Sequence, residues 1–214
     1  MAEVVIIYGK SGSGKSRSLK NFGDEELFYV NVTDKRLPFP NTFKFMSTTD
    51  SVDTILEGIK KMPCNVAVVD DAGYIMTNLF MAKNGEDLKG NAVFGLYNDI
   101  ANTIWKLILG IKQMPNSADK IVYLTFHEDI DDLGNSKLRT IGKLLDQKCC
   151  IEGLCTIVLH CIIKGNNHLF VTNSDGYDIA KSPEGMFEME IENDLKAVDT
   201  RIREFYGMSK GGKE

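Results

Sequence analysis

Hydrophobic positions along the chain form short continuous runs, separated by longer stretches in which they recur at helical spacing. The runs predict strands at 4–8, 27–32, 43–46, 66–69 and 121–126, and a pair of strands within 155–172 joined by Lys164-Gly165-Asn166-Asn167. Helical spacing predicts helices from about 15, over 52–62, over 94–114, around 141–148 and over 193–206. This alternation is typical of an α/β protein whose mainly parallel sheet is flanked by helices, with 155–172 as an antiparallel hairpin at one sheet edge.

Local signals set the limits of some elements. Ser51 is a favourable N-cap for the helix over 52–62, and Pro63 ends that helix. The polar stretch 83–91 is expected to be a mobile loop before the long helix. No repeat or linker divides the chain, so residues 1–208 are expected to form one domain and residues 209–214 a disordered tail.

The most specific motif directly follows the first apolar run. Gly9-Lys10-Ser11-Gly12-Ser13-Gly14-Lys15-Ser16 fits G-x-x-x-x-G-K-[ST] at every fixed position, between a strand and a predicted helix. In this P-loop pattern, backbone N–H groups turn inward around an anion, and the alternative is a glycine-rich turn without a ligand. We expect Lys15 to reach the β- and γ-phosphates of ATP, Ser16 to ligate Mg²⁺, and Arg17 to follow at the edge of the site.

A P-loop needs a second carboxylate for Mg²⁺, usually at the end of a neighbouring hydrophobic strand. Asp70 ends the apolar run 66–69 and is the candidate for this role. Two interpretations of Asp71 stay open, because it could polarise the attacking water as a general base or cap the element that follows. No glutamate stands at this position, so Asp34, just after the second strand, is the rival for water activation.

Polar residues also follow the strand predicted over 121–126, which should lie beside the nucleotide-binding strands. His127 or Thr125 is the candidate sensor of the γ-phosphate, and the alternative is that both only cap the next loop. His160 and His168 have no ligand-spaced cysteine or histidine set around them, so we expect packed or solvated side chains rather than metal ligands.

Composition narrows the class of protein further. The chain of 214 residues is 43% hydrophobic and 26% charged, which is ordinary for a globular domain. No apolar run approaches the roughly 20 residues that span a bilayer, so we expect a cytoplasmic protein without a membrane partner. The five cysteines form no C-x-x-C pair and fit neither a disulfide framework nor a zinc ribbon. The net charge of −5 argues against a globally basic surface but leaves room for a local basic groove.

Five segments follow one another in a set order: Gly9 to Ser16, Val68-Val69-Asp70-Asp71-Ala72, Ile141-Gly142-Lys143-Leu144-Leu145, Asp178-Ile179-Ala180-Lys181-Ser182-Pro183-Glu184-Gly185-Met186-Phe187 and Asn193-Asp194-Leu195. In this order they resemble the phage-encoded RecA-like ATP-binding proteins of the AAA type. That group includes single-strand annealing proteins of phage recombination systems. The resemblance implies a RecA-like P-loop NTPase core, ATP and Mg²⁺ as cofactors, a homo-oligomer, and action on single-stranded DNA in the cytoplasm of a phage host.

The resemblance also implies a basic residue that acts between subunits. In RecA-like assemblies ATP lies at a subunit interface, and a cation from the neighbour completes the site, as an arginine finger does. Lys181 lies where the resemblance would place such a residue, and Arg139 is the second candidate. A simple surface position is the alternative for Lys181.

Three functions remain as hypotheses. The first is an ATPase that binds single-stranded DNA as an oligomer and promotes annealing or recombination. The second is a regulatory or binding module that binds ATP, hydrolyses it weakly and controls a partner protein. The third, ranked last, is a small-molecule kinase, because none of the five arginines cluster in a plausible phosphate-clamping lid.

Overall fold

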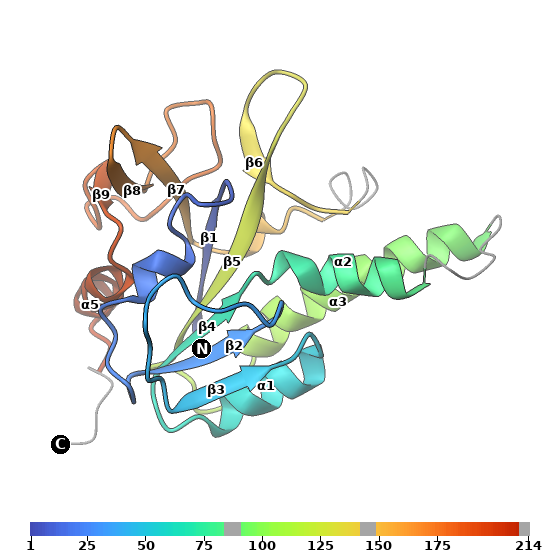
Figure 1. Cartoon of the computed structure of the whole chain (residues 1–214), viewed down its shortest axis with the longest axis horizontal. Coiled ribbons are helices and arrows are strands. Elements are labelled where there is room, and N and C mark those ends of the chain that lie inside the picture. Colours follow the sequence, from blue (N-terminus) through green and yellow to red (C-terminus); the bar gives the residue numbers. More distant parts are fainter. Residues whose placement is uncertain (84–90, 142–148, 210–214) are drawn as a thin grey trace.

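The computed structural model describes residues 1–83, 91–141 and 149–209, and within these ranges one mixed sheet holds nine strands (Figure 1). Its path runs β3-β2-β4-β5-β1-β7-β8-β9, and β6 pairs only with β5. Neighbours from β3 to β7 are parallel, whereas the β7–β8, β8–β9 and β5–β6 pairs are antiparallel. The strands are β1 (Glu3–Gly9), β2 (Leu27–Asn31), β3 (Phe45–Thr48), β4 (Val66–Asp70), β5 (Ile121–Ile130), β6 (Ser136–Leu138), β7 (Ile157–Lys164), β8 (Asn167–Val171) and β9 (Glu190–Glu192). The prediction of a mainly parallel α/β sheet is confirmed.

Helices cover both faces of this sheet (Figure 1). Alternate strand residues supply the two cores, so Val4 and Ile6 of β1 pack on one side while Val5 and Ile7 pack on the other. The first core joins the sheet to α1 (Val52–Lys61), α2 (Gly73–Lys83) and α3 (Asn91–Lys112). The second joins it to α5 (Leu195–Tyr206) and the 3₁₀ turn η1 (Ser16–Leu19). A second 3₁₀ turn, η2 (Glu152–Leu154), precedes β7.

The sheet order brings separate strand ends to one edge. Gly9 at the end of β1 pairs with His127 of β5, and Asn31 at the end of β2 pairs with Asp70 of β4. Because these strands are parallel, their carboxyl ends and the turns that follow gather at the same edge. Ligands of open α/β sheets bind in this position, so the register places the P-loop residues and Asp70 in one neighbourhood.

The prediction of a helix from about Lys15 is only partly correct, because the structure has a short 3₁₀ turn there and no α-helix. The structure has only the four-residue 3₁₀ turn η1, in which Ser18 Oγ donates to Lys15 O at 2.6 Å. Serines compete with the helical backbone for hydrogen bonds, and Gly23 follows within a turn or two, so the segment lacks the propensity for a longer α-helix. Anion binding here therefore depends on local N–H groups rather than on a long helix dipole.

Three further expectations need correction. The strand predicted to end at 126 continues to Ile130, because its last residues pair with β6. The β7–β8 hairpin is present, but β9 pairs outside β8, so the hairpin is not the sheet edge. Helix α2 was not predicted at all, since its apolar residues show little helical periodicity in the sequence.

The strand predicted at 43–46 lies two residues later, as β3, whereas the predicted helices over 52–62 and 193–206 are present as α1 and α5. Helix α1 begins after Ser51, whose Oγ accepts from Thr54 N at 3.4 Å. Helix α5 begins after the cap Asp194 and ends at Gly207, which has a φ of 64°. The loop, helix and tail expected at 83–91, 141–148 and 209–214 fall largely on residues 84–90, 142–148 and 210–214, which lie outside the described residues. The prediction of one domain over 1–208 stays a prediction.

Candidate nucleotide-binding site

The P-loop packs tightly against the β7–β8 hairpin. A Cβ added to Gly9 would lie 2.3 Å from the backbone oxygen of Cys161, and one added to Gly14, which has a φ of 112°, would lie 2.8 Å from His168 Nδ1. Ser13 O accepts from His168 Nδ1 at 2.6 Å and from Cys161 Sγ at 3.2 Å. The hairpin therefore packs directly against the P-loop. This close approach leaves no space for a Cβ at Gly9 or Gly14, so both positions require glycine.

Lys15 lies folded over the loop that it follows. Its Nζ donates to Gly9 O at 2.9 Å and to Lys10 O at 3.0 Å, and the residue is 6% exposed. Burial lowers the pKa of Lys15, while Asp71 and Asp70 act in the opposite direction. The ammonium is thus held at the centre of the loop with only carbonyl oxygens as direct partners, and a phosphate would supply it with a full counter-charge.

The backbone of the loop also has donors to offer. Within the described residues, the N–H groups of Ser11, Gly12, Gly14 and Lys15 donate to no protein acceptor, whereas Ser13 N donates to Lys10 O. Unpaired N–H groups gathered in one turn form an anion-binding nest. The loop is built to take phosphate oxygens.

Asp70 is the centre of a hydroxyl network beside the loop. Its Oδ2 accepts from Ser16 Oγ at 2.7 Å and from Tyr29 OH at 2.9 Å, and its Oδ1 accepts from Thr125 Oγ1 at 2.8 Å. The carboxylate is buried, at 4% exposure for the residue. These three hydroxyls come from η1, β2 and β5, so Asp70 is held in place by three elements at once.

The pair of Ser16 and Asp70 fits a magnesium ion. Mg²⁺ prefers oxygen ligands and is usually held by one or two carboxylates, waters and substrate phosphates rather than by a full protein cage. No group of three or more His, Cys, Asp or Glu residues that could hold a metal occurs in the described ranges. The Ser16 hydroxyl and the Asp70 carboxylate, 2.7 Å apart, lie beside the anion-binding loop. They could therefore hold Mg²⁺ together with phosphate oxygens and water.

Asp71 is a buried carboxylate with Lys35 and His127 as neighbours. It is 2% exposed and has a φ of 59°, which is uncommon for a residue other than glycine. Lys35 Nζ forms an ion pair with its Oδ2, and His127 Nε2 lies 3.4 Å from its Oδ1, although without the geometry of a hydrogen bond. Burial alone would raise the pKa of Asp71, but His127 and Lys35 outweigh it and hold this pKa well below the usual range.

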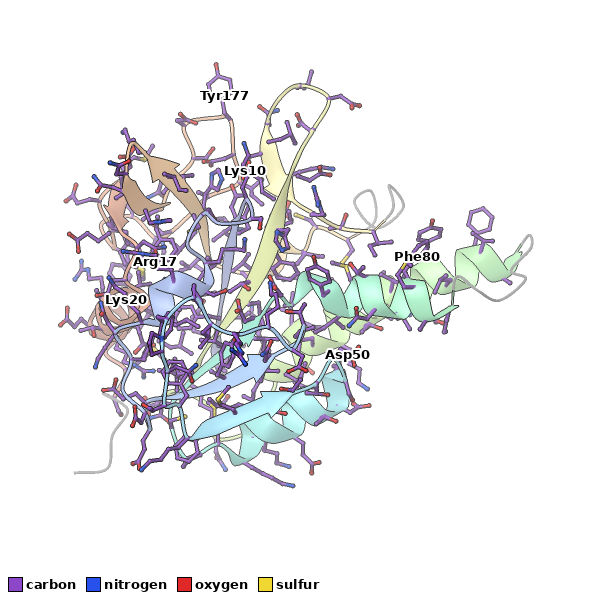
Figure 2. The ribbon with its side chains drawn as sticks, viewed as in Figure 1. Lys10, Arg17, Lys20, Asp50, Phe80 and Tyr177 are labelled. Atoms are coloured by element: carbon purple, nitrogen blue, oxygen red, sulfur yellow. The ribbon has the colours of Figure 1, made fainter. Side chains whose placement is uncertain are left out.

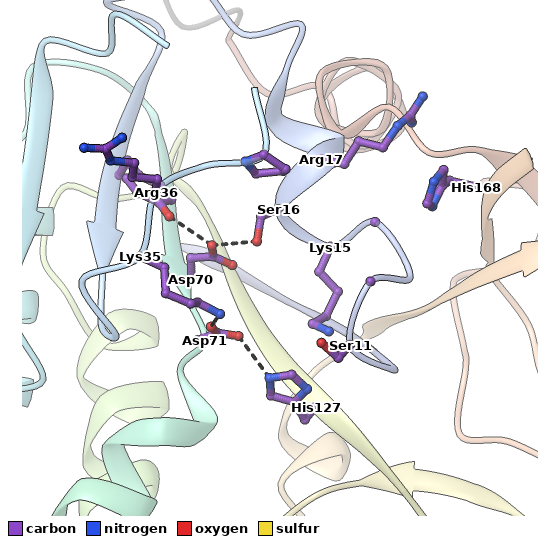
Figure 3. Close-up of a pocket in the computed structure, with 14 residues that line it drawn as sticks. Ser11, Lys15, Ser16, Arg17, Lys35, Arg36, Asp70, Asp71, His127 and His168 are labelled. Carbon is purple, nitrogen blue, oxygen red and sulfur yellow. Dashed lines mark hydrogen bonds and ion pairs between the residues drawn. The ribbon is translucent and has the colours of Figure 1, made fainter. Parts of the chain in front are cut away.

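These groups line one pocket of about 370 Å³. Lys35 and Arg36 lie across it from Lys15 and the P-loop (Figure 3). Neither residue was predicted from the sequence to be part of the site. The only indication in the sequence is a basic pair just after the strand predicted at 27–32. The pairing of β2 with β4 in the sheet brings this pair to the pocket.

Arg17 and Lys10 occupy the margins of the site. Arg17 lines the pocket, and its Nη1 donates to Asn193 Oδ1 at 3.3 Å, which directs it toward β9 and α5 (Figure 2). Lys10 is exposed and is absent from the pocket lining, although its backbone oxygen holds Lys15. His168, expected to be packed or solvated, lines the pocket and donates to the loop.

The two sensor candidates have different surroundings. Thr125 is fully buried, donates to Asp70 Oδ1 and accepts from Asp71 N at 2.6 Å, so its hydroxyl holds the two aspartates and faces no ligand. His127 lines the pocket, and its Nε2 has no hydrogen-bond partner in the described part of the chain. Of the two, only His127 lies where a sensor would have to lie.

The remaining candidates do not lie in the pocket of this chain. Asp34 is exposed and does not contribute to the lining. Lys181 forms an isolated antiparallel bridge with Val158, near the start of β7. Arg139 donates its backbone N–H to His127 O at 2.8 Å and lines an adjoining pocket, which His127 also lines.

The comparison with known families agrees with this geometry. A family described as an AAA domain matches residues 1–184, which includes the P-loop, Asp70 and the sheet from β3 to β8. The chain belongs to the AAA domain family. No protein in the curated collection of known proteins matches it. The architecture is accordingly that of an α/β P-loop NTPase, and this AAA domain is a nucleotide-binding P-loop protein. In its described residues, no helix combines the length and apolar character needed to cross a membrane.

Thr125 gives a test of how the AAA domain holds its aspartates. We expect Thr125→Val to lower the free energy of unfolding by about 1 to 3 kcal/mol, because Asp70 loses a buried donor and Asp71 N loses its acceptor. Urea denaturation measures this, with Thr200→Val as the control, since Thr200 Oγ1 donates to Lys196 O on the exposed face of α5. Equal losses in the two variants would contradict the structural role.

Proposed function

We propose that this protein binds ATP with Mg²⁺ and hydrolyses the bond between its β- and γ-phosphates. The observation that carries the proposal is the hydrogen bond between Ser16 and Asp70 at 2.7 Å. It lies beside a loop of unpaired N–H groups and across the pocket from Lys35 and Arg36. A pocket that only bound an anion would need no carboxylate next to it. A carboxylate and a hydroxyl in this place indicate a metal bound together with the phosphates.

Each residue of the site has a role in this proposal. The loop N–H groups and Lys15 bind the phosphate oxygens, and Ser16 and Asp70 hold the metal. A bound Mg²⁺ neutralises phosphate charge and orients the terminal group. Asp71 orients the attacking water, and His127, which lines the pocket beside Asp71, reports on the terminal phosphate.

The biological setting that we propose is the one implied by the family resemblance. The protein would act as a homo-oligomer on single-stranded DNA in phage recombination, with Lys181 or Arg139 reaching the ATP of a neighbouring subunit. Support comes from the order of the family segments in the sequence and from the position of both basic residues outside the pocket of their own chain. The second candidate is a nucleotide-dependent regulatory module, favoured by the ion pair that occupies Asp71 and by a net charge of −5.

One experiment separates the two candidates. We expect ATP hydrolysis to be stimulated by single-stranded DNA and to rise more steeply than linearly with protein concentration, because oligomerisation completes the site. Steady-state hydrolysis is measured with Mg²⁺ at several protein concentrations, with and without a homopolymeric DNA strand. A rate that is proportional to concentration and unchanged by DNA would reject the recombination function and favour the regulatory module.

A further inference from the structure

The turn after β2 is built around a buried asparagine. Asn31, 7% exposed, donates from Nδ2 to Lys35 O at 2.7 Å and accepts from Lys35 N at 3.2 Å. Asp34, with a φ of 53°, closes the turn in a left-handed conformation that asparagine and aspartate tolerate better than most residues. The backbone of Lys35 is therefore held in place at the pocket wall, while its side chain is free to change partners.

Lys35 stands between a buried carboxylate and the open pocket. Its Nζ forms an ion pair with Asp71 Oδ2, which also accepts from Thr33 Oγ1 at 3.3 Å. The side chain of Lys35 is 56% exposed, whereas that of Asp71 is 3% exposed. A lysine ammonium on a long flexible stem can exchange one anionic partner for another without a movement of the backbone.

The direction of a bound triphosphate follows from the two ends of the pocket. Mg²⁺ in P-loop proteins bridges the β- and γ-phosphates, so Ser16 and Asp70 mark that end. Lys35 pairs with the residue next to Asp70 on the same side (Figure 3). Arg17 and His168 line the other side and adjoin a second polar pocket, which leaves that side for the nucleoside. Lys35 therefore lies on the side of the pocket where the terminal phosphate would be bound.

We propose that Lys35 is a phosphate-binding residue supplied by the same chain, which contacts the γ-phosphate of ATP and is held by Asp71 until a triphosphate arrives. This inference rests on the proposed ATP-binding function and concerns the same site. It also assigns a positive charge at the terminal phosphate to the monomer, before any residue of a neighbouring subunit is considered.

The test compares affinities for ATP and ADP. With Mg²⁺ present, we expect Lys35→Ala to weaken ATP binding by about tenfold or more and ADP binding by less than about threefold, because only ATP carries the phosphate that Lys35 contacts. Binding is measured by calorimetry in a variant whose melting temperature is checked. The control is Lys44→Ala, since the side chain of Lys44 is 59% exposed, close to that of Lys35, and pairs with Glu25 away from the pocket. Equal effects of Lys35→Ala on ATP and ADP, or no effect on either, would overturn the inference.

A second variant tests the holding role of the aspartate. We expect Asp71→Asn to bind ATP at least as tightly as the wild type, because Lys35 no longer has a competing carboxylate, while hydrolysis falls. Weaker ATP binding by Asp71→Asn would contradict the exchange of partners. The inference and the proposed function fail separately: nucleotide binding that survives Lys15→Ala rejects the P-loop function, whereas an unchanged preference for ATP over ADP in Lys35→Ala rejects only the role of Lys35.

Discussion

Lys15→Ala is expected to remove most ATP affinity or turnover while the protein stays folded. The Nζ of Lys15 is held at the P-loop by two backbone carbonyls, Gly9 O and Lys10 O, and lines the pocket. Charge-assisted hydrogen bonds to phosphate are typically worth about 1.5 to 3 kcal/mol, so affinity should fall by about tenfold to more than a hundredfold. Calorimetric titration with ATP and a hydrolysis assay measure the loss.

The control for this variant must be a lysine in an ordinary surface pair. Lys61 fits, because its Nζ lies 3.0 Å from Glu57 Oε1 on helix α1 and both side chains are largely exposed. Lys61→Ala should leave ATP binding unchanged, and circular dichroism should show the same helix content in both variants. Unchanged nucleotide binding and hydrolysis by Lys15→Ala would defeat the P-loop assignment.

How much of this site the sequence could predict depends on how local each part is. The loop from Gly9 to Ser16 is a contiguous motif whose chemistry is carried by its own backbone, so its place directly after a strand was predictable. Asp70 was predictable as the polar end of a buried strand. Its partners Tyr29 and Thr125 were not predicted as partners, because they come from two other strands and meet Asp70 only through the sheet order.

The cation opposite the loop shows the limit of sequence reasoning. The family resemblance implies Lys181 or Arg139 as the cation that completes the site from another subunit. Lys35 lies opposite the P-loop in the same chain, because β2 lies beside β4 and its last residue, Asn31, pairs with Asp70. The order of strands in a sheet does not follow from their order in the sequence, so this contact could be found only in the fold.

Local structure was least predictable where propensity and tertiary contacts disagree. The segment after Lys15 carries the motif of a helix start, yet its serines and the following glycine leave only a 3₁₀ turn. Helix α2 carries apolar residues without a clear period, because it packs on both the sheet and α3. Strand β9 has three residues and is defined by its pairing with β8 rather than by its own pattern.

Asp70→Asn is expected to lower the rate of Mg²⁺-dependent ATP hydrolysis by about a hundredfold or more, while the affinity for nucleotide falls less. The carboxylate supplies the negative charge that holds the metal, and an amide of the same shape removes that charge. Hydrolysis is measured over a range of Mg²⁺ concentrations, and ATP affinity is measured with and without a chelator. The affinity of the wild type should depend on the metal, and that of Asp70→Asn should not.

Asp70 also organises three hydroxyls, so the loss of charge must be separated from the loss of structure. Tyr29→Phe serves as the control, because it removes one hydroxyl donor from Asp70 Oδ2 and leaves the carboxylate itself in place. We expect this variant to keep most of its hydrolysis, since Asp70 keeps its charge and the hydroxyl donors Ser16 and Thr125. If Asp70→Asn hydrolysed ATP as fast as the wild type, Asp70 would not hold the metal. If Tyr29→Phe lost as much activity as Asp70→Asn, the effect would come from the hydroxyl network rather than from the charge.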